Sequence, residues 1–193
     1  GLSLRNVTLT VYDGDKPIFS ELGEMLFTHF GVSGPLVLSA SSHIREMKPN
    51  RYHLAIDLKP ALDSEQLDAR IQRDFAENLN RDFINGIRKL LPAKLIPVIT
   101  RLSGIPEEQK INSITKEQRR RFGELIKAFP VRVSGFRPID EAIVTSGGIS
   151  VREIDPHTME SKLVRGLFFA GEVIDVDAYT GGFNLQIAFS TAY

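Results

Sequence analysis

The period of the apolar residues changes twice along this 193-residue chain, and this change limits the folds that the chain can adopt. Residues 2–12 and 51–58 alternate apolar and polar side chains, which is typical of half-buried β-strands. Between residues 61 and 128 the apolar side chains recur at helical spacing, and short extended stretches return after residue 129. The sequence therefore predicts an α+β chain of several parts, with helices inserted into a β-structure.

The first sixty residues are predicted to be mostly extended, with one short helix. Ser33 is expected near the N-cap of that helix and Pro35 in its first turn. The expected elements are a strand over 2–12, a turn over 13–15, a return strand over 16–19, the helix over 36–44 and a strand over 51–58.

Residues 61–128 are predicted to form a small helical subdomain. Its first helix is expected from a cap at Asp63 or Ser64 to about Asn80, with an apolar stripe of Leu67, Ile71, Phe75 and Leu79. The other expected features are a short helix over 83–91, a helix from Pro92 that Pro97 bends or interrupts, and a helix after the capping box Thr115–Gln118 with Phe122, Leu125 and Ile126 on its apolar side.

Charge is balanced over the whole chain, 24 basic against 24 acidic residues, but it is unevenly distributed. Residues 61–137 carry 15 basic and 10 acidic side chains, whereas residues 138–193 carry 3 and 8. The basic excess includes Arg119, Arg120 and Arg121. A solvated helix face is the commoner explanation of such a run, and an RNA site is the alternative.

Several classes of site are excluded by what the sequence lacks. There is no Cys, so disulfides, thiolate metal sites and cysteine nucleophiles are absent. The four His show no ligand spacing, and we expect no metal. No apolar run approaches the ~20 residues that cross a bilayer, and no signal segment opens the chain, so we expect a cytoplasmic location.

The strongest chemical signals lie in the last third of the chain. Strands are predicted over 141–145 and 149–154, with a tight turn over 146–148 between them. Residues 166–171 form a continuous apolar run between glycines, which favours a strand buried on both faces. Glu172 would then lie at the carboxyl end of a sheet strand, where open α/β sheets hold ligands, and could accept hydrogen bonds from sugar or ribityl hydroxyls.

A glycine pair precedes the final apolar helix. Gly181 and Gly182 let a ligand approach the backbone closely, and the helix start behind them offers free N–H groups and a positive dipole end. An acceptor that gains negative charge on reduction, such as the pyrimidine edge of a flavin, suits this position. The alternative is that the glycines only form turns.

Four ordered motifs identify a family resemblance: 144–149 (VTSGGI), 158–162 (TMESK), 166–177 (GLFFAGEVIDVD) and 181–186 (GGFNLQ). Their succession resembles the C-terminal flavin-binding segment of the BaiN-like, aminoacetone-oxidase-type family of NAD(P)/FAD-dependent oxidoreductases. Residues 23–35 (GEMLFTHFGVSGP) look like the signature of the domain inserted in that family.

The resemblance implies a fold in three parts. Residues 1–60 and 129–140 would form a β-barrel, residues 61–128 the inserted helical subdomain, and residues 141–193 the C-terminal part of a Rossmann-like FAD-binding domain.

The resemblance also implies roles for individual residues. Glu172 matches the acid near the ribityl hydroxyls, and residues 182–185 match the segment that passes the isoalloxazine ring. Asp175 and Asp177 could each line the site or cap a local turn. The implied cofactor-binding residues are Thr145, Gly147, Gly148, Gly171, Glu172, Asp175, Gly181, Gly182, Phe183, Asn184 and Leu185.

A substrate site is suggested inside the inserted-domain signature. Thr28, His29 and Ser33 could face a small-molecule substrate, and the alternative is a capped helix with a structurally bonded His. No side chain stands out as a catalytic acid or base, which fits hydride chemistry performed by FAD, with NAD(P)H as a candidate reductant.

Complete members of the family begin with a G-x-G-x-x-G fingerprint, and the 15 glycines here never form even a G-x-G. We therefore expect the chain to be a fragment of a longer flavoenzyme and to bind little FAD by itself. The rival hypothesis is a non-catalytic RNA- or protein-binding module. The acidic last third and the ordered flavin motifs argue against it and against a nucleic-acid partner, whereas no oligomeric state follows from the sequence.

Overall fold

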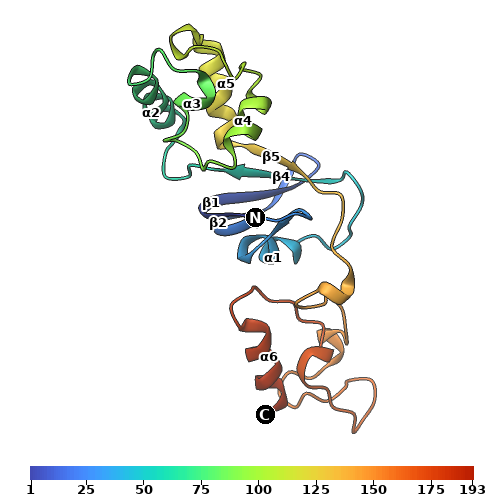
Figure 1. Cartoon of the computed structure of the whole chain (residues 1–193). Helices are drawn as coiled ribbons and strands as arrows, with labels where there is room; N and C mark the ends of the chain where they lie inside the picture. Colours follow the sequence, from blue (N-terminus) through green and yellow to red (C-terminus); the bar gives the residue numbers. More distant parts are fainter.

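The computed structural model describes all of residues 1–193 and shows three parts arranged end to end (Figure 1). A β-sheet with one short helix lies in the middle, a group of helices lies at one end, and the C-terminal part lies at the other. The final helix and the helical group thus lie at opposite ends of an elongated molecule.

The sheet is antiparallel, with five strands in the order β3-β2-β1-β4-β5. β1 and β2 form a hairpin, as their alternating pattern and the turn at Gly14 predict. The ring of Phe27 at the end of β2 meets Phe129 on edge, with centroids 6.1 Å apart, so the sheet curls into a half-barrel. The strands are β1 (Leu2–Asp13), β2 (Lys16–Phe27), β3 (Val32–Ser33), β4 (Tyr52–Asp57) and β5 (Phe129–Arg132).

The helical segment leaves the sheet after β4 and returns to it in β5, which pairs with β4. Capping boxes start two of its helices, at Asp63 with Gln66 and at Thr115 with Gln118. The helices of the chain are α1 (Pro35–Ser41), α2 (Ser64–Ala76), α3 (Phe83–Gly86), α4 (Ile96–Ser103), α5 (Lys116–Lys127) and α6 (Phe183–Ala192), with 3₁₀ turns η1 (Ile111–Ser113), η2 (Ile139–Glu141), η3 (Val151–Glu153) and η4 (Gly171–Val173).

A single hydrophobic core joins the sheet to the helices and stops short of the C-terminal part. In the helical group the rings of Phe75, Phe83 and Phe122 pack together, and Phe83 and Phe122 are fully buried. In the C-terminal part only Ile154 and Ile174 are buried. Burial therefore stabilises the half-barrel and its helices much more than residues 139–193.

Two local predictions in the first two parts are wrong. Ser33 lies next to the N-cap of α1, as predicted, but the cap itself is Gly34, because the chain is still paired with β2 at Ser33. Leu79 is 50% exposed, because α2 ends at Ala76 and the stripe no longer faces the core. Pro97 does not interrupt a helix: α4 begins at Ile96, so Pro97 occupies the first turn, where no N–H is needed.

The strands predicted in the C-terminal part do not form in this chain. Residues 149–154 and 166–171 make only isolated bridges, such as Ile149 with Ile174 and Glu160 with Phe168, and residues 141–145 make none. A buried strand needs paired neighbours and two covered faces, whereas Phe168 is 59% exposed. Residues 146–148 likewise form no tight turn. The Rossmann-like arrangement expected for 141–193 is not present as a sheet.

Candidate functional site

Four of the predicted cofactor residues line one small hollow in the C-terminal part, namely Thr145, Gly171, Glu172 and Asn184. Its volume of about 30 Å³ is room for little more than one water molecule. It cannot contain a ring system and can only form one edge of a larger site. The remaining lining residues are Val144, Ile174, Val176, Ile187 and Ala188.

Two contacts of the backbone build this hollow. The Gly171 N–H donates to Thr191 Oγ1 at 2.9 Å, which holds η4 against α6. The Ile149 N–H donates to the Val173 carbonyl at 2.8 Å, which brings the segment before residue 149 alongside η4. Residues twenty or more positions apart in the sequence thus meet beside α6, and the Gly171 bond reaches the last turn of this helix.

The N-terminus of α6 presents unpaired donors at this place. Gly182 has a left-handed conformation (φ 94°), which glycine adopts without strain, and its carbonyl accepts the first helical bond from the Gln186 N–H. The N–H groups of residues 183–185 have no partner within the chain. A Cβ at Gly182 would meet no atom within 4 Å, so the space over this glycine is open. These features fit an electron-rich group that approaches the helix end.

Glu172 and Asn184 differ in how free their side chains are. The Asn184 amide is bonded in both directions to the backbone of Ala178, with distances of 2.8 and 2.9 Å, so it holds the loop before α6. Glu172 is exposed and makes no hydrogen bond or ion pair within the chain. Of the two, only Glu172 keeps its oxygens free to accept hydrogen bonds from a ligand.

The glycines and the aspartate next to the hollow have structural roles. A Cβ at Gly148 would overlap the carbonyl oxygen of Val173, so glycine is required there for the close contact of two backbone segments. Asp175 Oδ1 accepts a hydrogen bond from the Gly147 N–H at 3.2 Å. Gly148 and Asp175 thus hold backbone segments together beside the hollow, and the space over Gly147 is open.

The substrate residues proposed from the sequence lie outside the hollow. Thr28 closes a turn, since its hydroxyl donates to the Gly31 carbonyl at 3.2 Å. His29 is exposed and packs against the ring of Phe30, and Ser33 is paired with Leu26 in the sheet. The structure thus brings none of the three to the start of α6.

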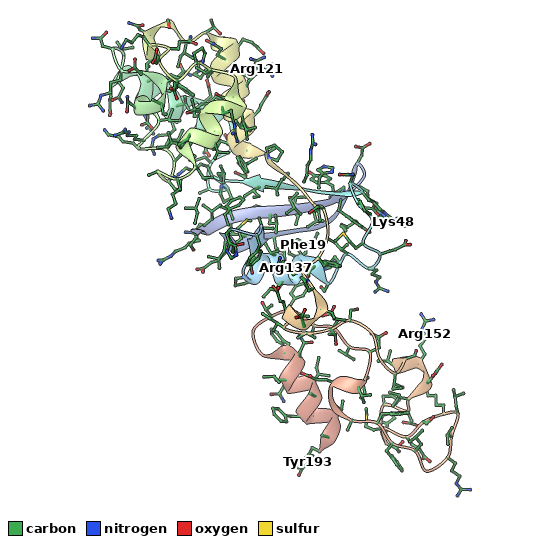
Figure 2. The ribbon with its side chains drawn as sticks, turned by 45° about the vertical axis from the view of Figure 1, so that its right-hand side comes forward. Phe19, Lys48, Arg121, Arg137, Arg152 and Tyr193 are labelled. Carbon is green, nitrogen blue, oxygen red and sulfur yellow. The ribbon has the colours of Figure 1, made fainter.

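A contact that the sequence did not predict joins the sheet part to the loop before α6. His43 Nε2 lies 3.1 Å from the hydroxyl of Tyr179, and the ring of Phe19 packs edge-on against Tyr179. Figure 2 shows Phe19 where the sheet part faces the C-terminal part. The two partners of the hydrogen bond are 136 positions apart, so no spacing could reveal it.

Two ionisable groups in this contact are perturbed. Burial raises the pKa of Asp177, and the nearby charge of Asp175 raises it further. Removal from water also raises the pKa of Tyr179, and Glu21 adds to that rise. The phenol therefore stays protonated across the neutral range.

No group of three or more His, Cys, Asp or Glu side chains that could hold a metal ion occurs in the structure. No helix has both the length and the apolar character needed to cross a bilayer.

Comparison with known proteins defines the class. Residues 1–144 match the HI0933-like protein barrel and H2TH domain, a flavoprotein-related domain that combines a barrel with helices, as the half-barrel and α2–α5 do here. The chain therefore belongs to the HI0933-like family.

Curated relatives carry two kinds of name. "Ribosomal RNA dihydrouridine synthase" of Haemophilus influenzae is 33% identical over 193 residues, covering 100% of this chain and 45% of the relative. The protein of the same name from Escherichia coli is 32% identical over 169 residues (88% and 40%). "3-dehydro-bile acid delta(4,6)-reductase" of Clostridium scindens is 29% identical over 194 residues (93% and 44%). The chain spans less than half the length of each relative.

Proposed function

We propose that this chain is the inserted domain and flavin-facing segment of an FAD-dependent oxidoreductase. The observation that carries the proposal is the start of α6, which offers three free N–H groups and an open glycine, together with the hollow that Asn184 of this helix and the unbonded Glu172 line. Membership of a flavoprotein-related family supports it. The small size of the hollow fits a partial site, to which other residues of the full-length protein contribute.

In this proposal the protein binds and orients the flavin, and the flavin, when bound, supplies hydride transfer. The N–H groups of residues 183–185 stabilise negative charge at the edge of the ring system that they face. Glu172 accepts hydrogen bonds from hydroxyls of the ribityl chain. Asn184 holds the loop before α6, and the bond from Gly171 to Thr191 holds η4 against the last turn of the helix, so that the two segments keep their relative positions.

The names of the relatives suggest the class of reaction. Dihydrouridine differs from uridine by two hydrogens added across a ring double bond, and a delta(4,6)-reductase also acts on carbon–carbon double bonds. We take the reduction of such a bond as the activity of the full-length protein. NAD(P)H remains our proposal for the source of the hydride, based on the resemblance in the sequence.

The test is FAD affinity of full-length variants, measured by quenching of flavin fluorescence. Glu172→Ala removes a charged acceptor, which costs about 1.5–3 kcal/mol, or roughly tenfold or more in affinity. Gly182→Val places a branched side chain in the open space over the helix start and is expected to weaken binding as well.

Matched controls separate these effects from general damage. Glu153→Ala removes another exposed glutamate of a 3₁₀ turn whose side chain has no partner, and Gly166→Val changes another glycine with positive φ in open space. Both should leave FAD affinity unchanged. Equal affinity of the two site variants and the two controls would overturn the assignment of this end of the chain to the flavin.

A further inference from the structure

A polar hollow lies on the helical group, at the opposite end of the molecule from α6 (Figure 1). Its volume is about 300 Å³, and no apolar side chain lines it. It surrounds the start of the short helix α3. The lining residues are Asn80, Arg81, Asp82, Asn85, Arg88 and Lys110.

The backbone holds the two walls of this hollow in a fixed relation. Asp82 and Lys110 form an antiparallel bridge, and the Ile111 N–H donates to the Arg81 carbonyl at 3.0 Å. Gly86 in α3 packs tightly on Ile111, where an added Cβ would lie 2.6 Å from Cδ1. The two walls are therefore part of the folded core's edge and not two independent loops.

The charge of the hollow is positive and largely unneutralised. Three basic side chains face one carboxylate, and Asp82 is bonded to Lys110 at 2.7 Å. Arg81 and Arg88 are exposed and have no ion pair or hydrogen bond within the chain. Two guanidinium groups are thus left with all their donors free.

Three other arginines of the helical group differ in this respect. Arg70 is paired with Asp74 at 3.0 Å, Arg119 with Asp68 at 2.7 Å, and Arg120 with Glu117 at 2.8 Å. In the run at 119–121 that stands out in the sequence, Arg119 and Arg120 are thus neutralised and Arg121 is not. Arg73, Arg101 and Arg121 also lack an ion pair, so the hollow is distinguished by the two unpaired arginines that line it together with Lys110 and two asparagine amides.

The hydrogen-bond donors that line the hollow favour a phosphate as its ligand. Guanidinium groups bind phosphate oxygens in a bidentate manner, and the amides of Asn80 and Asn85 add neutral donors beside them. The absence of an apolar wall disfavours a stacked base or a lipid tail. An open, water-exposed site gains little from a single anion, but it gains from a polyanion that releases counterions along its length.

We propose that this hollow binds the phosphate backbone of an RNA substrate. The inference rests on the proposed function in one respect, because it names the substrate class of that reductase as RNA in place of the small molecule expected from the sequence. A substrate that contacts both the hollow and the start of α6 must extend over most of the molecule, as a folded RNA can (Figure 1). The name of two relatives, a ribosomal RNA dihydrouridine synthase, agrees with this substrate class.

The experiment measures binding of a fluorescently labelled RNA hairpin to the chain, without flavin, by anisotropy at about 50 to 200 mM salt. The double variant Arg81→Ala/Arg88→Ala is expected to bind about tenfold more weakly and to lower the salt slope by about 1–2. Replacement of the same residues by Lys keeps the charge and should restore part of the affinity.

The matched control is Arg70→Ala/Arg120→Ala, which removes the same charge from paired arginines of the same helical group. It should change RNA affinity less than twofold or so, since these groups already bind carboxylates. An equal loss in both double variants, or no RNA binding at low salt, would overturn the proposal. Competition by inorganic phosphate or by poly-glutamate as effective as by unlabelled RNA would overturn it too, in favour of a free anion or an acidic protein.

Because the assay contains no FAD, its result is separate from the test of the flavin site. If the Glu172 variant keeps full FAD affinity while the arginine variants lose RNA, the flavin assignment fails and the RNA site stands. The reverse pattern leaves a flavoenzyme that does not hold RNA at this hollow.

Discussion

Single glycines in the helical group differ in the space around them, and this difference predicts opposite effects of the same substitution. A Cβ at Gly86 would lie 2.6 Å from Ile111 Cδ1. Gly86→Ala therefore forces the side chain of Ile111 or the backbone of α3 to move. We expect a loss of about 1–3 kcal/mol in the free energy of unfolding, measured by urea denaturation of the chain.

Gly123 in α5 is the matched control for that prediction. The nearest atom to its added Cβ is Ile71 Cδ1 at 3.7 Å, an ordinary contact, so Gly123→Ala should stabilise the chain by up to about 1 kcal/mol through helix propensity alone. Ile111→Val should relieve much of the defect in Gly86→Ala, because it removes the overlapping methyl group. A neutral Gly86→Ala variant would contradict the close packing described for α3.

An ion pair connects two helices of the helical group. Arg119 in α5 bonds to Asp68 in α2 at 2.7 Å, and Gln72 also donates to Asp68. The hydrogen bond from Arg119 lowers the pKa of Asp68 below its ordinary value of 3.8. The stabilisation from a carboxylate with a lowered pKa is complete above the unfolded-state value and disappears as the pH falls through the folded-state value.

Asp68→Asn should therefore lower the melting temperature at neutral pH, and the difference from wild type should shrink as the pH falls below about 4. The pair is partly exposed, so about 1 kcal/mol or less is expected at neutral pH. Thermal unfolding followed by circular dichroism across pH checks this. Glu108→Gln, an exposed glutamate without a side-chain partner, should show no such pH-dependent difference. A constant gap down to low pH would exclude the ion pair as its cause.

The elements that could be predicted from the sequence are those whose formation depends on residues close together in the chain. The cap at Asp63 and the capping box at Thr115 are each encoded within four residues, and both form as predicted, with Gln66 completing a second capping box at Asp63. In the strand over 2–12 the alternation of apolar and polar residues itself indicates which side chains are buried, and β1 forms there. The apolar run 166–171 has no such local cause, because a strand requires neighbours that the run itself does not specify.

Among the candidate site residues, too, some could be predicted from local sequence and others depend on distant partners. The start of α6 at Gly182 could be predicted from its glycine pair and the apolar helix behind it. The roles of Gly148 and Asn184 could not, since each depends on a partner segment brought close by folding. The arginines of the polar hollow escaped notice for a related reason: whether an arginine is neutralised depends on which carboxylate lies next to it in space.

At the scale of the whole molecule, the junction between the sheet part and the C-terminal part is thin. The hydrophobic core does not cross it. Tyr179 joins His43 and Phe19 across the junction, and the guanidinium of Arg137 lies over the ring of Phe30 at 4.7 Å. Phe19 and Arg137 are labelled in Figure 2. An extended substrate that reaches both ends of the molecule would depend on the angle that these few contacts maintain.

Tyr179→Phe isolates one of these contacts, because it removes the hydroxyl that bonds His43 and keeps the ring that packs on Phe19. A hydrogen bond of this kind contributes roughly 0.5–1.5 kcal/mol, enough to shift the balance between a fixed and a mobile junction severalfold. We expect a broader distribution of distances between the two parts, with little change in melting temperature, since the core lies elsewhere.

The chain has no cysteine, so two introduced cysteines can carry spin labels without further changes. Lys48→Cys in the sheet part and Arg152→Cys in the C-terminal part are exposed and lie on either side of the junction (Figure 2). Pulsed electron paramagnetic resonance on the frozen protein gives the distribution of distances between the two spin labels. Tyr193→Phe, at the exposed end of the chain, is the control and should leave it unchanged. If Tyr179→Phe also leaves the distribution unchanged, the aromatic and cation–π contacts alone fix the junction, and the His43–Tyr179 bond has no part in holding the two ends in line.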